Sequence, residues 1–213
     1  MRLAVPVATL AWCIWPTCVL AQIHVPAVQG AGRSATPAIT DVRFDESADG
    51  IRMSGNIRFT LPDTLRQTLD RGAPVYFLFE THTTRSRWYW SDKDVAVNRR
   101  YVRVLFQPLT QRWRVNVSSE PFSRGSVGVT LNQNYNSLDA ALAVVRRISS
   151  WPVLDKNAWS SDGNYQVRAR FRMDVSQLAQ PFQMNVGWVG GSLDVERTFR
   201  LTQQDLGKTV GAS

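Results

Sequence analysis

The stretch YQVRARFRMDV, residues 165–175, indicates the fold most clearly, because an apolar side chain stands at every odd position and a polar one at every even position. A period of two places these two sets of side chains on opposite faces of a β-strand. Similar alternation occurs at 51–59, 113–117 and 184–188, and a further strand is expected at 101–106. The chain is therefore predicted to be mainly β, with strands that have one buried and one solvated face.

One expected strand breaks this alternation. Residues 75–79 read VYFLF, a continuous apolar run. Such a run is typical of a strand that is covered on both faces, so we expect it near the centre of a sheet. Gly190 and Gly191 form a two-residue hairpin signal between apolar segments.

Two short helices interrupt the strands. The first is predicted from Pro62 to Arg71, with Pro62 at its first position and Gly72 as its stop. The second is predicted from Ser137, a suitable N-cap, through apolar residues at helical spacing as far as Ile148. The expected fold is an antiparallel β-sandwich or a strongly curved sheet with two short covering helices.

The first residues have the order of a secretory signal. Arg2 precedes an uncharged, mainly apolar run from Leu3 to Leu20, and Ala21 offers a small residue for cleavage. An uncleaved N-terminal anchor is the alternative, because a run of about eighteen residues approaches the length that spans a bilayer. The predicted organisation is a signal peptide over 1–21, a flexible leader over 22–38, a single β-rich domain over 39–206 and a disordered tail over 207–213.

Composition restricts the chemistry and the partners. Both cysteines, Cys13 and Cys18, lie inside the predicted signal peptide, so the exported chain has no disulfide and no thiol chemistry. The formal net charge is +8, carried mostly by arginine. Export to the periplasm argues against nucleic acid as a partner. An acidic protein or an anionic envelope polymer is expected instead.

The sequence contains no catalytic constellation. Glu80 and His82 share a strand face, but His24 is the only other histidine, and it lies in the leader. We therefore predict no metal site, no cofactor and no enzymatic activity. The alternative is an envelope glycan hydrolase that uses a carboxylate pair, for which Asp92 and Asp94 are close in sequence.

Arginines provide the clearest candidate binding surface. Arg168, Arg170 and Arg172 fall on the solvated side of one strand, and Arg112 and Arg114 form a similar pair. Two interpretations stay open: the arginines form a cationic face for phosphate or carboxylate partners, or cross-strand acids such as Asp194 and Glu196 neutralise them.

An aromatic segment provides a second candidate. Trp88 and Trp90 would share one strand face, flanked by Arg85 and Arg87. The pair could bind a sugar ring or a protein, or it could fill the core.

The order of several segments resembles an uncharacterised proteobacterial family, catalogued as domain of unknown function 4390. The segments are LP…L…L…GAPV at 61–75, RSRWYW at 85–90, YVRVLF at 101–106, NSLDAAL at 136–142, YQVRARFRM at 165–173 and the late W…S at 188–192. The resemblance implies a periplasmic protein of Gram-negative bacteria, sometimes encoded beside a nitrogen-regulation-like sensor kinase. It brings no known activity and no catalytic residues. The expected function is a non-catalytic binding or interaction module, accessory to a membrane sensor kinase or to an envelope component.

Overall fold

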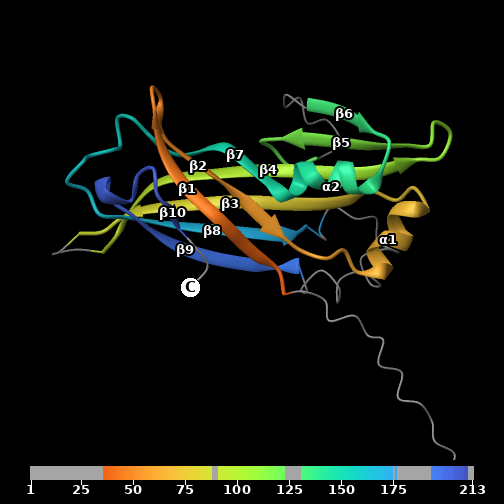
Figure 1. Cartoon of the computed structure of the whole chain (residues 1–213), viewed down its shortest axis with the longest axis horizontal. Coiled ribbons are helices and arrows are strands. Elements are labelled where there is room, and N and C mark those ends of the chain that lie inside the picture. The colour runs from red at the N-terminus through yellow and green to blue at the C-terminus, as the bar shows by residue number, and fades with distance from the viewer. Residues whose placement is uncertain (1–35, 88–90, 123–130, 175, 177–192, 211–213) are drawn as a thin grey trace, which may run out of the picture. The chain divides into compact units, whose positions relative to one another are not determined.

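Two antiparallel sheets make up the β-structure (Figure 1). The computed structural model describes residues 36–87, 91–122, 131–174, 176 and 193–210. The four-stranded sheet has the order β10 (Thr209–Val210), β1 (Ala38–Ser47), β2 (Gly50–Arg58) and β7 (Arg147–Asp155). The six-stranded sheet has the order β6 (Leu131–Tyr135), β5 (Arg112–Ser118), β4 (Lys93–Gln107), β3 (Val75–Arg85), β8 (Tyr165–Met173) and β9 (Val195–Leu201). The predicted mainly β, antiparallel fold is confirmed.

Strand β8 shows why this sequence makes a sandwich. Its odd-numbered residues are all buried, and its even-numbered residues are exposed or half-buried. The buried set is Tyr165, Val167, Ala169, Phe171 and Met173. Burying an apolar side chain of this size contributes about 1.5–3 kcal/mol, so the alternation fixes which face of the strand turns inward.

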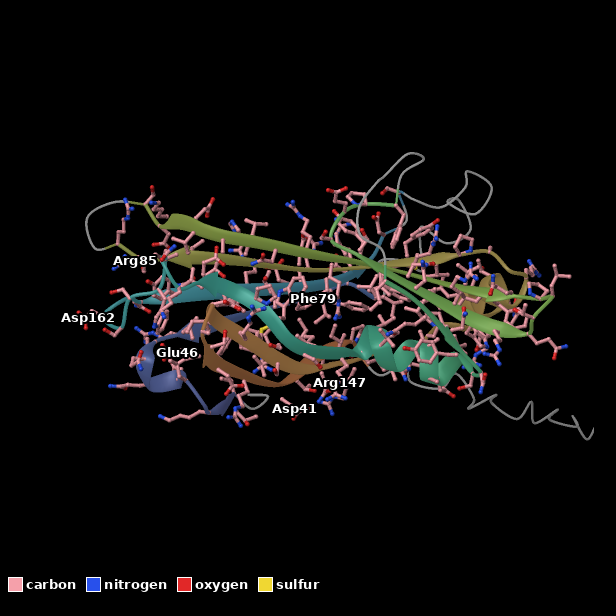
Figure 2. All side chains as sticks on the ribbon, turned by 90° about the horizontal axis from the view of Figure 1, so that it is seen from above. Asp41, Glu46, Phe79, Arg85, Arg147 and Asp162 are labelled. Atoms are coloured by element: carbon pink, nitrogen blue, oxygen red, sulfur yellow. The ribbon has the colours of Figure 1, made fainter. Side chains whose placement is uncertain are left out.

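Aromatic rings and hydrogen bonds join the inner faces of the two sheets. The ring centroid of Phe44 on β1 lies 6.0 Å from that of Phe199 on β9. Thr83 Oγ1 on β3 donates to the carbonyl oxygen of Val153 on β7 at 3.0 Å. Figure 2 shows Phe79 in the layer between the sheets, where its ring meets the edge of Trp151.

The predicted central strand is confirmed. β3 lies between β4 and β8, and all five residues of the apolar run at 75–79 are buried. The strand continues to Arg85, beyond the predicted run, because Thr81 and Thr83 take buried positions as hydrogen-bonded polar residues.

Both predicted helices are present, as α1 (Asp63–Asp70) and α2 (Leu138–Arg146). Pro62 is the N-cap of α1. Ser137 caps α2, since its side chain accepts a hydrogen bond of 3.2 Å from the amide of Ala140. Helix α2 ends before the predicted Ile148, because the next residue already has the extended backbone with which β7 begins (φ −95, ψ 128).

The two ends of the described domain differ from the expected boundaries. β1 begins at Ala38, the last residue of the predicted leader. In the predicted disordered tail, Thr209 and Val210 pair with Arg43 and Val42 of β1, and a single 3-10 turn over Gln203–Asp205 precedes them. Unsatisfied backbone groups at the edge of β1 explain this pairing.

Some predicted segments lie outside the described residues. These are the signal peptide, the leader up to residue 35, the aromatic residues Trp88 and Trp90, the strand at 184–188 and the hairpin at Gly190–Gly191. Within the described ranges, no helix combines the length and apolar character needed to cross a membrane.

Candidate functional site

The candidate site is the face of the six-stranded sheet that points away from the four-stranded sheet, which we call the outer face. The inner face of β8 carries the buried odd-numbered residues, so the outer face carries Arg168, Arg170 and Arg172, as predicted. Their side chains are 59%, 40% and 36% exposed. We call these three residues the β8 cluster.

One acid on the neighbouring strand β9 and one just before it neutralise two members of the β8 cluster. Arg170 donates from Nε to Oδ1 of Asp194 at 2.9 Å, and a second short contact makes the pair bidentate. Arg168 Nε lies 3.4 Å from Oε1 of Glu196. These are the cross-strand acids that the second interpretation of the sequence named, and both interactions are present.

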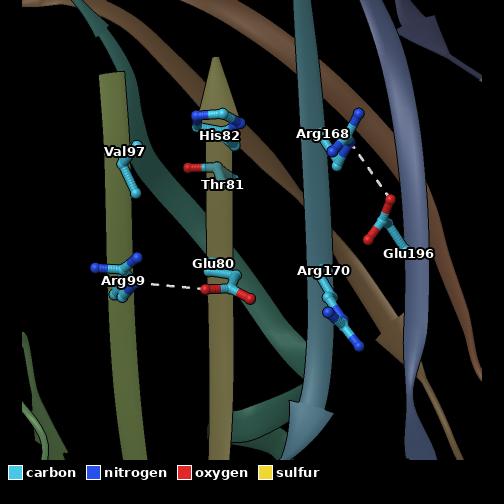
Figure 3. A pocket seen from close by; sticks show the side chains of 8 residues that line it. All are labelled: Glu80, Thr81, His82, Val97, Arg99, Arg168, Arg170 and Glu196. Carbon is cyan, nitrogen blue, oxygen red and sulfur yellow. Dashed lines mark hydrogen bonds and ion pairs between the residues drawn. The ribbon is translucent and has the colours of Figure 1, made fainter. Parts of the chain in front are cut away.

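Glu80 on the central strand takes part in two further ion pairs. Its Oε2 lies 3.4 Å from Nε of Arg99 on β4, and its Oε1 lies 3.9 Å from Nε of Arg172 on β8. Glu80 therefore links the two strands that flank β3, as Figure 3 shows for Arg99. Sequence reasoning missed Arg99. The strand alternation at 101–106, continued backwards, is the signal that places it on the outer face.

A groove of about 280 Å³ runs over these charged strands (Figure 3). Its lining is Glu80, Thr81, His82, Val97, Arg99, Arg168, Arg170 and Glu196. The expected common face of Glu80 and His82 is present. The carboxylate nearest to the imidazole is that of Asp94, with 3.2 Å between His82 Nε2 and Asp94 Oδ1. The groove thus offers a mixed pattern of positive and negative groups.

The hydrogen-bonded pair of Arg170 and Asp194 favours the charged state of each residue. The hydrogen bond from Arg170 lowers the pKa of Asp194 most, and the positive charges of Arg170 and Arg172 lower it further. The same hydrogen bond raises the pKa of Arg170. Both partners therefore stay ionised at neutral pH.

Arg112 and Arg114, which we call the β5 cluster, lie on the same outer face but apart from the β8 cluster. Strands β4 and β3 separate β5 from β8, which is about 14 Å at about 4.8 Å per strand. The two clusters are also offset along the strands. In the sheet register, Arg172 is level with Tyr101 of β4, whereas Arg114 is level with Leu105, four residues further along β4. The five predicted arginines therefore form two clusters about 20 Å apart.

Polar but uncharged partners hold Arg114 of the β5 cluster and its neighbour Arg103. Arg114 Nε donates to Asn134 Oδ1 at 3.4 Å, and Arg103 Nε donates to Asn116 Oδ1 at 3.1 Å. All 17 aspartates and glutamates of the chain fall within the described residues. None of them forms an ion pair with these arginines there.

Cations outnumber acids on the whole outer face. Strand alternation and register place eight arginines on it, namely Arg99, Arg103, Arg112, Arg114, Arg168, Arg170, Arg172 and Arg200. Five carboxylates lie on it or directly continue its strands, namely Glu80, Asp94, Asp174, Asp194 and Glu196. The difference of 8 − 5 leaves a surplus of three positive charges on this face.

The candidate catalytic acids have separate partners. Asp92 accepts a hydrogen bond of 3.1 Å from Ser86 Oγ, whereas Asp94 pairs with His82. Across the described ranges, no group of three or more His, Cys, Asp or Glu side chains is placed to hold a metal ion. Nothing in this geometry marks two carboxylates as a hydrolytic pair.

The fold and the site define an antiparallel β-sandwich with an arginine-rich, partly ion-paired sheet face. The model of the family described as Domain of unknown function (DUF4390) matches residues 34–201, and the chain belongs to this family. The resemblance on which the sequence prediction rests is confirmed. No curated protein and no solved structure matches the chain.

Proposed function

We propose that this chain is an exported, periplasmic, non-catalytic binding module that engages an acidic protein or an anionic envelope polymer through the outer face. The surplus of arginines on that face is the observation that supports the proposal. Arginine pairs with carboxylate and phosphate through two parallel hydrogen bonds, so such a surface favours partners rich in these groups.

The β5 cluster and Arg103 are better placed for this contact than the β8 cluster. A partner of the β8 cluster would have to displace Asp194, Glu196 or Glu80. The binding free energy would then be only the difference between the new ion pair and the ion pair that it replaces. A partner of Arg112 and Arg114 meets no competing carboxylate. We therefore move the centre of the proposed contact towards the β4–β5 end of the sheet.

Packing orients one arginine at this end. The guanidinium carbon of Arg103 lies 4.9 Å from the centroid of the Phe122 ring, and that ring lies 6.0 Å from the ring of Tyr76. Stacking on an aromatic face fixes the guanidinium plane, which lowers the entropy cost of binding an anion.

A charge-reversal experiment tests the proposal. The variant Arg112→Glu/Arg114→Glu is compared with wild type in capture of partners from envelope extracts at about 0.15 M ionic strength. The matched control is Arg66→Glu/Lys208→Glu, which changes the net charge equally at two exposed residues away from the outer face. We expect the first variant to lose a partner that wild type and control both retain.

Two results would reject this contact. Retention of every partner by Arg112→Glu/Arg114→Glu would remove the β5 cluster from the interface. If both variants lost the same partners, the loss would be due to the change in net charge and not to the β5 cluster. The triple variant Arg168→Glu/Arg170→Glu/Arg172→Glu tests the β8 cluster in the same way, after its folding has been verified by circular dichroism.

The proposed partner and location have tests of their own. Family membership motivates a role beside a membrane sensor kinase, and crosslinking in intact cells followed by mass spectrometry would identify such a neighbour. Export predicts that the protein is recovered from the periplasmic fraction with Gln22 as its first residue. An intact N-terminus on membrane-bound protein would instead support the uncleaved anchor.

A further inference from the structure

Three cations gather where β3 ends and β4 begins, away from the outer face. Arg85 ends β3 and lies directly opposite Lys93, the first residue of β4. Arg87 follows two residues later, and both arginines line two adjoining hollows at this end of the sheet. These cations are independent of the proposed outer-face contact, because Arg85 is on the same side of β3 as the inward-facing Thr83.

The larger hollow lies between the strand ends and the loop after β7. It measures about 400 Å³ and is lined by Arg85, Arg87, Lys93, Val95, Asp155, Asn157 and Ala158. The second, of about 340 Å³, is lined by Arg85, Ser86, Arg87, Asp162, Gly163 and Asn164. Both volumes fall in the range of small-molecule sites, about 300–1,000 Å³.

None of the three cations has an acidic partner. Every aspartate and glutamate of the chain lies in the part that the structure describes, and within that part none forms an ion pair with Arg85, Arg87 or Lys93. This distinguishes the cluster from Arg168 and Arg170, which are both paired. Like charges directly opposite each other on adjacent strands destabilise a sheet, so Arg85 and Lys93 are an unfavourable pair unless an anion bridges them.

The buried ring of Tyr165 supports the guanidinium of Arg85. Its guanidinium carbon lies 5.7 Å from the ring centroid of Tyr165, which is fully buried. The Tyr165 ring stacks on Trp159, with 5.2 Å between centroids, and its hydroxyl donates to the carbonyl oxygen of Ala158 at 2.8 Å. The guanidinium is thus oriented by a rigid support, while its N–H edges remain available for an oxyanion.

The chain beside Arg85 is fixed as well. The amide of Ser86 donates to the carbonyl oxygen of Asn164 at 2.9 Å, and Ser86 Oγ donates to Asp92. These bonds fix the backbone between Arg85 and Arg87, whose side chains line the two hollows. Preorganised donors bind an anion more tightly because less freedom is lost on binding.

We propose that Arg85, Arg87 and Lys93 form a binding site for a phosphate-type oxyanion carried by a small molecule or a headgroup. A tetrahedral phosphate group, with a charge of −1 as a diester and near −2 as a monoester, can accept hydrogen bonds from a guanidinium and an ammonium together. It would turn the opposed Arg85 and Lys93 into a bridged pair, and the hollow leaves room for the group to which the phosphate is attached.

Calorimetric titration of the purified full chain with inorganic phosphate and with glycerol phosphate, at about 0.15 M ionic strength, tests the site. Arg85→Gln/Lys93→Gln removes two donors, and Arg66→Gln/Lys208→Gln is the matched control with one arginine and one lysine changed elsewhere. We expect saturable binding to wild type and control, and a dissociation constant at least about tenfold weaker for the first variant. Equal affinity in all three proteins would overturn the proposal.

Vesicles of phosphatidylcholine with and without phosphatidylglycerol separate the two sources of the phosphate group. Binding of the soluble phosphates supports a free ligand, and binding only to the phosphatidylglycerol vesicles supports a lipid headgroup, provided that Arg85→Gln/Lys93→Gln abolishes it. Absence of saturable binding in every arm would overturn the proposal. Folding does not confound the result, because neutralising two opposed cations is expected to preserve the thermal midpoint without ligand. Added phosphate should then raise the midpoint of wild type and of the Arg66→Gln/Lys208→Gln control, but not that of Arg85→Gln/Lys93→Gln.

Discussion

The indole Nε1 of Trp151 donates a hydrogen bond of 2.9 Å to Oγ1 of Thr81, which joins the four-stranded sheet to the six-stranded sheet. Thr81 is buried and lies on the inner face of the central strand, whereas Trp151 is half-buried on the edge strand β7. The bond fixes how one sheet is positioned over the other. It also explains why a threonine takes the place of an apolar residue in the middle of β3.

Replacement of Thr81 by valine keeps the shape of the side chain and leaves the Trp151 N–H without its partner. The free energy of unfolding should fall by about 1–3 kcal/mol, measured by urea denaturation. Thr84→Val, at a half-buried outward position of the same strand, is the control and should change it by less than about 0.5 kcal/mol. Trp151→Phe should cost less in the Thr81→Val background than in wild type. If the losses of Thr81→Val and Trp151→Phe were additive in the double variant, the hydrogen bond between the two side chains would contribute nothing to stability.

Regular alternation made the fold predictable from the sequence. Tyr165–Met173 alternates without exception, and each of its apolar residues is buried as expected. The apolar run at 75–79 did not indicate which residues of β3 beyond Phe79 turn inward, because Thr81 and Thr83 are buried through bonds to β7, which lies about seventy residues away. A local pattern does not report a hydrogen bond to a distant strand.

The site was predicted in part, for a related reason. Strand alternation located Arg168 and Arg170 on a solvated face, but only the pairing of β8 with β9 decides that Asp194 neutralises Arg170. From the sequence, Arg85 was predicted only to flank the aromatic segment, and no anion site was predicted there. Its opposition to Lys93 depends on the register between β3 and β4, which includes a bulge between Thr83 and Thr84.

Gly50, at the turn between β1 and β2, is required by close contact as well as by its backbone. Its φ is +134, and a Cβ there would lie 2.2 Å from the carbonyl oxygen of Leu154. Gly50→Ala should lower the free energy of unfolding by more than about 2 kcal/mol. Gly207 has φ +73 and open space around it, so Gly207→Ala should cost only about 1–2 kcal/mol. Equal losses in thermal or urea unfolding would mean that β7 moves away and relieves the contact.

The pair of Arg170 and Asp194 should make stability depend on pH in acid. Because the pKa of Asp194 is lowered in the folded chain, its contribution is fully present above the ordinary value of 3.8 and is lost as the pH falls through the folded pKa. The pair is partly exposed, so the contribution should stay below about 1 kcal/mol.

Urea denaturation of Asp194→Asn and Arg170→Gln measures this contribution, since each substitution removes the same pair. Both variants should have a lower free energy of unfolding than wild type at about pH 7, and the difference should nearly vanish at about pH 2. A gap that stayed constant across this range would show that the ion pair does not contribute, and that the substitutions act through packing.

Arg100 is a half-buried cation on the inner face, and its charge should cost stability. Its guanidinium donates to the carbonyl oxygen of Arg147 at 3.2 Å and lies near the rings of Phe79 and Trp151. Its Nε has no hydrogen-bond partner, and burial lowers the pKa of Arg100 to about 10. Within the described residues, which hold every aspartate and glutamate, no ion pair includes Arg100.

Replacement of Arg100 by methionine should therefore leave the free energy of unfolding unchanged or raise it by up to about 2 kcal/mol. Arg100→Lys should lower it, because a compact ammonium loses more hydration on burial than a guanidinium and cannot stack on the two rings. The folded chain would release the lysine proton at a lower pH than the unfolded chain, so the stability of Arg100→Lys should rise between about pH 8 and about pH 10. Arg100→Met has no titrating side chain at this position. The difference in free energy of unfolding between the two variants, measured by urea denaturation, should therefore narrow over that range. A methionine variant less stable than the lysine variant throughout would show that the positive charge itself holds β4 against β7.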